Sequence, residues 1–220
     1  MRTDTSGEAA TLVSVNVGVV REVLFHGEVR TTGIWKDPVP GPVTLHTLGA
    51  EGDQQADRIN HGGTNKAVYA YAVEDAAWWQ DQLGIPIPPG TFGENLTVVG
   101  MTMNDALIGE RWRVGGAVVQ VTQPRFPCWK LGLRMNDSRF TKRFLDAGRA
   151  GAYLSVVQEG VVAAGDEVVR ISRPGHSLTV GLVAYLNHAD RPKALQLLEA
   201  AERGSEPEQL DELVLRAGVA

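Results

Sequence analysis

The sequence predicts a mostly β protein, in which a closed barrel or sandwich of short strands with short flanking helices precedes a small helical segment. Up to Pro174, short runs rich in β-branched residues are separated by glycine-rich turns, and few stretches have helical spacing. After Pro174 the pattern changes to short stretches with helical spacing. A chain of 220 residues is long enough for one substantial core and a small appendage.

The first half of the predicted barrel contains strands, two loops and a helix. Residues 12–20 alternate and are rich in β-branched side chains, which is typical of a strand. The proline-dense residues 35–42 and the Gly-, Asp- and Asn-rich residues 49–65 predict loops. Further strands are expected at residues 43–48, 67–71 and 94–99, and residues 74–83 have the spacing of a helix.

The second half is expected to contribute a hairpin, a short helix and the last strands. Gly115 and Gly116 separate two β runs, residues 106–114 and 117–122, and a Gly-Gly pair suits the tight turn of a hairpin. Residues 140–147 predict a short helix, and residues 152–158 and 167–171 predict further strands of the barrel.

The C-terminal segment is expected to form three short helices, at residues 178–187, 192–203 and 206–216. Three such helices are marginal alone, so they should pack on the barrel or on a partner subunit, and a homodimer is one expectation. The predicted organisation is a frayed tail over residues 1–11, a barrel domain over residues 12–173 and a helical domain over residues 174–220.

The composition narrows the classes of function. A formal net charge of −5 gives no general case for binding a nucleic acid polymer. One cysteine excludes an internal disulfide framework and suits a reducing compartment. The polar N-terminus has no apolar signal core, and no segment is apolar over a membrane-spanning length, so we expect a cytoplasmic protein that makes no membrane contact.

The single cysteine, Cys128, ends the stretch Gln123-Pro-Arg-Phe-Pro-Cys128 and is a strong candidate for chemistry. Pro127 stiffens the backbone before the thiol, while Arg125 and Lys130 place cationic groups on either side. Nearby positive charge favours the thiolate, which is both a nucleophile and a metal ligand. The alternative is that Cys128 is a small buried hydrophobic residue.

Two further stretches have the composition of ligand-binding loops. In Asn60-His-Gly-Gly-Thr-Asn-Lys66, the glycines allow positive φ and close backbone approach, and His61 and Lys66 add donors suited to an anion. The alternative is a tight turn with a solvated lysine. In Thr91-Phe-Gly-Glu-Asn-Leu96, Asn95 offers a donor and an acceptor, unless Glu94 and Asn95 only satisfy the start of a strand.

Acidic residues and absent motifs limit the other options. Glu51, Asp53 and Asp57 do not match a calcium loop, and we expect them to orient the loop of His61 or Arg58. The sequence contains no Gly-x-Ser-x-Gly, His-Glu-x-x-His or Cys-x-x-Cys, and no Gly-x-Gly-x-x-Gly after a strand. Serine hydrolases, zinc proteases and dinucleotide enzymes are therefore disfavoured.

Several stretches, taken in order, resemble the MOSC domain family, named for the C-terminal domain of molybdenum cofactor sulfurase. They are Gly52-Asp53, His61-Gly-Gly-Thr-Asn-Lys66, Phe92-Gly-Glu-Asn-Leu96 and Gln123-Pro-Arg-Phe-Pro-Cys128. The chain length, the Gln-Pro-Arg-x-Pro-Cys form and the helical tail resemble its bacterial YiiM-like branch. The resemblance implies a MOSC-type β-barrel, over about residues 15–172, that holds a molybdenum–molybdopterin cofactor (Moco).

The resemblance also implies roles for individual residues. Cys128 aligns with the cysteine that ligates molybdenum, and it is the expected catalytic residue. His61, Gly62, Gly63 and Lys66 fall where the family binds the pterin and its phosphate. Further cofactor contacts are carried over to Asn95, Arg125 and Lys36.

Relatives in this branch reduce N-hydroxylated bases such as 6-hydroxylaminopurine, so the resemblance implies a molybdenum-dependent oxidoreductase that converts N–OH to N–H. The sequence has no flavin, haem or iron–sulfur signature, so electrons would come from a separate reductase. Arg125 or Lys130 would stabilise the departing oxyanion, and Trp129 would either stack on a flat substrate or simply pack near the barrel mouth. Three alternatives remain: a non-catalytic cofactor carrier, a persulfide sulfur carrier that uses Cys128, and a binding module without chemistry.

Overall fold

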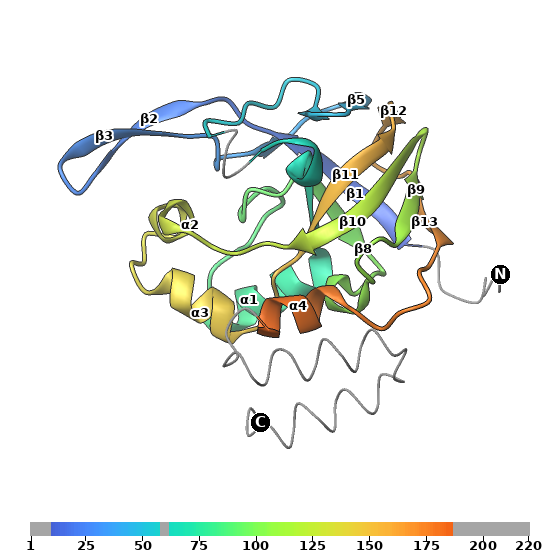
Figure 1. The fold of residues 1–220 in the computed structure, drawn as a ribbon. Helices are drawn as coiled ribbons and strands as arrows, with labels where there is room; N and C mark the ends of the chain where they lie inside the picture. The colour runs from blue at the N-terminus through green and yellow to red at the C-terminus, as the bar shows by residue number, and fades with distance from the viewer. Residues whose placement is uncertain (1–9, 58–61, 187–220) are drawn as a thin grey trace, which may run out of the picture.

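The computed structural model describes residues 10–57 and 62–186, and seven of its strands close into a barrel (Figure 1). Around the barrel the strands follow the order β13-β9-β10-β11-β7-β8-β1, and β1 pairs with β13 to close it. The barrel strands are β1 (Ala10–Val17), β7 (Val68–Ala72), β8 (Leu96–Val99), β9 (Arg111–Val114), β10 (Ala117–Pro124), β11 (Ala152–Gln158) and β13 (Glu167–Ser172).

Neighbouring barrel strands are antiparallel, apart from β7 and β8. That pair is parallel because helix α1 (Val73–Leu83) carries the chain back between them. The predicted barrel is thereby confirmed, as is the hairpin β9–β10 with its turn at Gly115 and Gly116.

Shorter elements lie outside the barrel. β2 (Arg21–Phe25) and β3 (Glu28–Thr32) form a hairpin that projects from the body of the molecule (Figure 1). β4 (Asp37–Pro38) extends the sheet beside β1. A small sheet contains β12 (Gly160–Val162), β5 (Val43–His46) and β6 (Gly49–Ala50). Short helical elements are η1 (Thr64–Lys66), η2 (Met103–Asp105), α2 (Trp129–Arg134), α3 (Phe140–Asp146) and α4 (Val180–Leu186).

Some boundaries differ from the expectations. Strand β1 covers Ala10–Val17 rather than residues 12–20, because the Gly18 amide leaves the ladder and donates a hydrogen bond to Asp53. The β2–β3 hairpin and α2 were not predicted. Helix α4 lies within the predicted residues 178–187, whereas the helices predicted at residues 192–203 and 206–216 lie outside the described residues.

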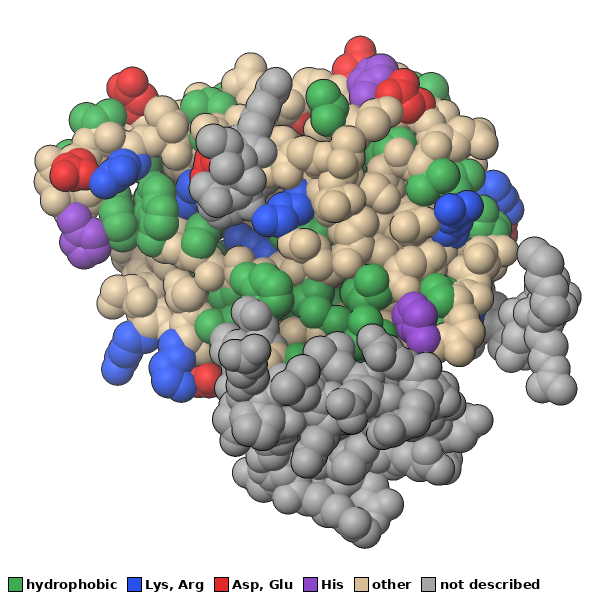
Figure 2. Space-filling view, viewed as in Figure 1, with side chains coloured by type: hydrophobic (Ala, Val, Ile, Leu, Met, Phe, Trp, Pro, Cys, Tyr) green, Lys and Arg blue, Asp and Glu red, His purple; other side chains and the backbone are tan. Residues whose placement is uncertain are grey.

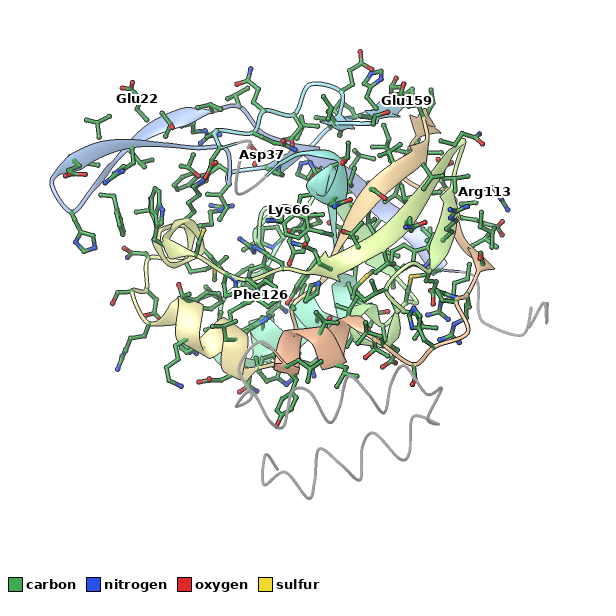
Figure 3. All side chains as sticks on the ribbon, in the orientation of Figure 1. Glu22, Asp37, Lys66, Arg113, Phe126 and Glu159 are labelled. Carbon is green, nitrogen blue, oxygen red and sulfur yellow. The ribbon has the colours of Figure 1, made fainter. Side chains whose placement is uncertain are left out.

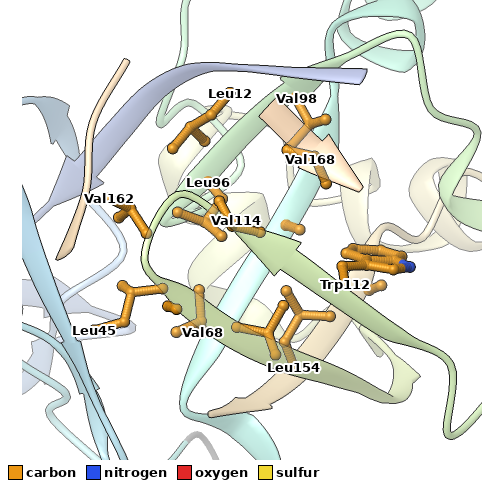
Figure 4. Packing of buried hydrophobic residues seen from close by; sticks show 14 of the residues in the cluster. Leu12, Leu45, Val68, Leu96, Val98, Trp112, Val114, Leu154, Val162 and Val168 are labelled. Carbon is orange, nitrogen blue, oxygen red and sulfur yellow. The ribbon is translucent and has the colours of Figure 1, made fainter. Parts of the chain in front are cut away.

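The barrel interior is filled mainly by aliphatic side chains (Figure 4). They alternate with outward residues along each strand, as in β9, where Trp112 and Val114 are buried while Arg111 and Arg113 are exposed. Burying each large apolar side chain contributes roughly 1.5–3 kcal/mol, so this cluster is the main source of barrel stability.

A second, aromatic cluster covers the outer face of β7. Val68, Ala70 and Ala72 point into the barrel, while Tyr69 and Tyr71 point outward. The outward rings pack with side chains from α1, α3 and the loop before β8, namely Trp79, Phe140, Phe144 and Phe92. Strand β7 is therefore buried on both faces, which explains its continuous apolar sequence. Within the described ranges, no helix is long and apolar enough to cross a membrane.

Candidate functional site

An open cavity lies beside the barrel, where η1, β7 and β11 meet four further segments of the chain. The segments are the end of the β2–β3 hairpin, the region around Asp53, the loop before β8 and the stretch that follows β10. Figure 3 shows Lys66 close to this region and Phe126 on the stretch between β10 and α2. The polar side chains that line the cavity include Thr32, Gln54 and Gln55. The titratable ones and one further amide are Lys36, Asp53, Lys66, Tyr69, Asn95, Arg125, Cys128, Lys130 and Tyr153.

Cys128 is held between the end of β10 and the start of α2. Its backbone is extended, with φ −130° and ψ −178°, and its carbonyl oxygen accepts a hydrogen bond of 2.9 Å from the Leu131 amide in the first turn of α2. The side chain is half-buried and lines the cavity. The interpretation as an inert core residue is therefore disfavoured, because core cysteines do not line open cavities.

Lys36 and Asp53 form a buried ion pair in the cavity wall. The Lys36 side chain is 8% exposed and that of Asp53 is 2% exposed. Burial lowers the pKa of Lys36, and the neighbouring Asp53 carboxylate opposes that shift. An isolated ammonium group at this depth would be costly, so the carboxylate is what allows a charged lysine here.

Asn95 lies beside this pair, and its amide orientation is set by its partners. Its Nδ2 donates hydrogen bonds of 3.0 Å to Asp53 Oδ2 and 3.2 Å to the Asn16 carbonyl oxygen. Its Oδ1 accepts a hydrogen bond of 3.2 Å from the Tyr69 amide. Both ends of the amide are therefore assigned by the network, and Asn95 ties the cavity wall to strands β1 and β7.

Arg125 is buried and held by the loop and by aromatic rings. Its Nη1 donates a hydrogen bond of 2.7 Å to the Phe92 carbonyl oxygen. Its guanidinium carbon lies 5.2 Å from the ring centroid of Tyr69 and 5.7 Å from that of Phe144. A planar guanidinium can stack on rings while it donates in its own plane, so the aromatic cluster fixes Arg125 at the cavity wall.

Glu94 has a structural role, as the second interpretation of its stretch expected. Its carboxylate accepts hydrogen bonds from the amides of Gly90, at 2.6 Å, and Phe92, at 3.0 Å. Burial raises the pKa of Glu94 despite these hydrogen bonds. Gly93, at the end of this tight loop, has φ 79°, which favours glycine. A Cβ there would also lie 3.0 Å from Ile34 Cγ1, which is too close for most side chains.

The His61–Lys66 loop is described only from Gly62 onward. Gly63 has the expected positive φ, at 85°. Gly63 precedes the single turn of η1, which directs Lys66 to the cavity, where its Nζ lies 6.0 Å from the Tyr153 ring centroid. Gly62 and Gly63 do not line the cavity themselves, and His61 lies outside the described residues.

The cavity carries a surplus of positive charge in an acidic chain. Among the described residues, four cations and one carboxylate line it, which gives a formal charge of +3 (4 − 1), against −5 for the whole sequence. Figure 2 shows Lys and Arg side chains near the centre of this face, above a band of hydrophobic side chains. Such a cavity favours an anionic ligand.

The metal-binding side chains present also limit which metal or metal-containing cofactor the cavity could hold. In the part of the chain that the structure describes, no three His, Cys, Asp or Glu side chains gather into a metal site. A metal held here would have one thiol from the protein and would need other ligands from an organic anion. One thiolate with surrounding cations therefore fits a molybdenum–pterin group better than a bare metal ion.

The structure brings together five of the predicted site residues: Lys36, Lys66, Asn95, Arg125 and Cys128. It adds Tyr69 and Tyr153, which sequence reasoning missed because both lie in strands that show only strand patterning. Among the described residues, the partners of Asp53 are Lys36, Asn95 and Gly18. Arg58 and His61 lie outside the described residues, so the expectation that Asp53 orients them stays a prediction.

Trp129 packs outside the cavity wall. Its ring centroid lies 4.4 Å from that of Phe25 on the β2–β3 hairpin, and Trp129 is not a lining residue. The packing interpretation therefore describes Trp129 better than a stacking platform. Lys130, the next residue, is buried and does line the cavity.

Comparisons with known proteins identify relatives of this chain. The MOSC domain family matches residues 57–169. YflK of Bacillus subtilis is 37% identical over 183 residues, which are 83% of each chain, and YiiM of Escherichia coli is 35% identical over 156 residues, 69% of each. A protein of Gibberella moniliformis named "Reductase" is 33% identical over 168 residues, 74% of this chain but 29% of its own length. The crystal structure of YiiM from Geobacillus stearothermophilus superposes with a TM-score of 0.70 at 28% identity, covering 94% of this chain and 99% of the other.

Proposed function

This protein belongs to the MOSC domain family, and from that premise we propose that it is a molybdenum-cofactor-dependent reductase of N-hydroxylated compounds. The observation that carries the proposal is the single cavity in which the Cys128 thiol meets a surplus of cations. The relative from Gibberella moniliformis named "Reductase", which this chain matches over 29% of that protein's length, agrees with redox chemistry. We further propose a cytoplasmic location, because a lone functional thiol is best preserved in a reducing compartment.

The residues of this chain divide the task of holding the cofactor. Cys128 would ligate the metal as a thiolate, and Lys36, Lys66 and Asn95 would bind the anionic and polar groups of the pterin. When bound, the cofactor would supply the two electrons that, with two protons, convert N–OH to N–H and water. Electrons would reach the site from a separate reductase.

The protein's own contribution to the reaction is electrostatic. Arg125 is fixed by the Phe92 carbonyl and by two rings, and Lys130 is buried at the cavity wall. Both would stabilise negative charge as the hydroxyl oxygen leaves the substrate nitrogen, without moving to do so. Burial raises the pKa of Tyr69 and of Tyr153, so both phenols stay protonated at neutral pH. Tyr153 would therefore present a hydrogen-bond donor to the cavity.

Metal content and turnover test the proposal together. Protein made in a host that synthesises the cofactor should contain about one molybdenum per chain by elemental mass spectrometry, and Cys128→Ala should lower this by about tenfold or more. Wild type should reduce 6-hydroxylaminopurine when dithionite-reduced viologen supplies electrons, and Cys128→Ala should not. Arg113→Gln, at an exposed position on β9, is the control and should match the wild type in both assays.

The alternatives give different results in the same samples. A cofactor carrier would contain molybdenum without reducing N–OH groups. A sulfur carrier would contain no molybdenum, and cyanide would release sulfur from Cys128. A wild type without metal, despite confirmed cofactor supply, would contradict the proposed reductase.

A further inference from the structure

Asp53 is the sole carboxylate among the described residues that line the cavity, and it accepts hydrogen bonds from three groups of the protein. Its Oδ1 accepts from the Gly18 amide, at 2.9 Å, and from Lys36 Nζ. Its Oδ2 accepts from Asn95 Nδ2, at 3.0 Å. A carboxylate that faced a bound anion alone would repel it, so these three donors suggest that Asp53 acts through its neighbours.

Asp53 offsets the effect of burial on the charged form of Lys36. Burial lowers the pKa of Lys36, the nearby Arg125 guanidinium acts in the same direction, and Asp53 and Glu94 oppose both. The other titratable groups that line the cavity are Lys66, Lys130, Tyr69, Tyr153 and Cys128, and among these the lysines add only further positive charge. Asp53 is the carboxylate in direct contact with Lys36, so it is the main support for the ammonium form.

We infer that Asp53 is a positioning residue: it keeps Lys36 charged and holds it in place for an oxyanion ligand such as the phosphate of a pterin, and it fixes the amide of Asn95 in the cavity wall. The inference rests on the proposed function for the identity of the ligand, but not for the electrostatics. One carboxylate thereby organises two groups that come from distant parts of the chain.

The change Asp53→Asn separates this role from simple structural support. The asparagine has the same shape, and its Oδ1 can still accept from the Gly18 amide. It removes the negative charge, however, so Lys36 loses its proton at a lower pH than in the wild type. At low pH Lys36 is charged in both proteins, so the two affinities should differ least there.

The experiment is a calorimetric titration of the full chain with sulfate, whose charge is constant, from about pH 6 to about pH 10. In Asp53→Asn the affinity should fall at a lower pH than in the wild type. Where only the variant has lost the Lys36 charge, the difference should be about tenfold or more, as expected for a charged hydrogen bond. Asp37→Asn is the matched control, since Asp37 is 80% exposed and close to Lys36 in sequence, and it should behave like the wild type.

Arginine at position 36 provides a rescue that a merely structural role would not allow. An arginine stays protonated throughout this range, so Asp53→Asn combined with Lys36→Arg should bind sulfate at high pH again. Thermal unfolding of each variant establishes that it is folded. If Asp53→Asn follows the wild-type profile, or if affinity is lost at every pH and arginine restores none, the inference is wrong.

The result also separates this inference from the proposed function. A wild type that contains molybdenum but binds no sulfate in its metal-free form would overturn the role of Asp53 and leave the reductase standing. A wild type that contains no molybdenum, yet shows the predicted sulfate profiles, would overturn the reductase and support the role of Asp53.

Discussion

Two buried carboxylates of this barrel have opposite surroundings. Glu110 is 0% exposed, and its two oxygens accept hydrogen bonds from Trp112 Nε1 at 2.7 Å and from the Leu107 amide at 3.3 Å, while Arg170 and Arg173 each lie 3.1 Å away. Asp53 is nearly as buried but lines a cavity where cations outnumber carboxylates.

The difference distinguishes a structural charge from a functional one. Around Glu110 both carboxylate oxygens are hydrogen-bonded within the protein, and the two arginines are partly exposed and do not line the cavity. Around Asp53 the positive charge is in excess, and the excess faces the cavity. Burial alone therefore does not identify a functional ion pair. An excess of positive charge that lines an open cavity does.

The largest expected effect is a loss of stability when the Glu110 carboxylate is removed. Glu110→Ala should lower the free energy of unfolding by about 2–6 kcal/mol, because two buried donors, Trp112 Nε1 and the Leu107 amide, lose their acceptor at roughly 1–3 kcal/mol each. Urea unfolding measures this change. Sulfate affinity should stay unchanged, since Glu110 does not line the cavity.

A control on a second carboxylate tests whether burial is the cause. Glu159 is exposed and accepts hydrogen bonds from Thr47, so Glu159→Ala should change the unfolding curve far less. Equal losses for the two variants would contradict the assignment of Glu110 as a buried structural charge.

Arg125→Lys should affect both stability and binding, because Arg125 belongs to the aromatic cluster and to the cavity. A lysine cannot keep the bond to the Phe92 carbonyl and stack on Tyr69 at the same time, so we expect a loss of about 1–3 kcal/mol in unfolding free energy. Sulfate affinity should also fall. A variant with unchanged unfolding would show that charge alone, not ring stacking, holds this position.

The smallest effect is expected at Lys66, which is only half-buried. Lys66→Ala should weaken sulfate binding by roughly two- to fivefold, and less at high salt, with no change in unfolding. Lys142→Ala is the control, because Lys142 is an exposed residue of α3 that does not line the cavity. An equal loss in both variants would mean that sulfate responds to net charge rather than to the cavity.

Local patterning was sufficient to predict most of the barrel. The alternation in β11 and the Gly-Gly turn between β9 and β10 are properties of neighbouring residues, and both predictions are confirmed. The hairpin β2–β3 was missed although a local signal exists: His26 and Gly27 form a two-residue turn in which both have positive φ, at 51° and 79°. Helix α2 has only six residues, with Gly132 inside, and gives almost no periodic signal.

The site was harder to predict than the fold. Motifs indicated Cys128, Arg125 and Lys66, but no local pattern pairs Lys36 with Asp53, seventeen positions further on. Nor does any pattern show that Tyr69 and Tyr153 meet the same cavity, because that depends on the pairing of β7 with β11. Contacts between strands depend on register, and register is a property of the whole sheet.

The closure of the barrel by β1 and β13 has a consequence for the order of assembly. Ala10 pairs with Val168, so the last pairing joins the two ends of the barrel sequence, and the cavity draws its walls from Thr32 to Tyr153. Contacts of such high sequence separation form late, since loop closure must come first. We therefore expect the cavity to form only once most of the barrel has folded, so that a prosthetic group would bind after the barrel is assembled.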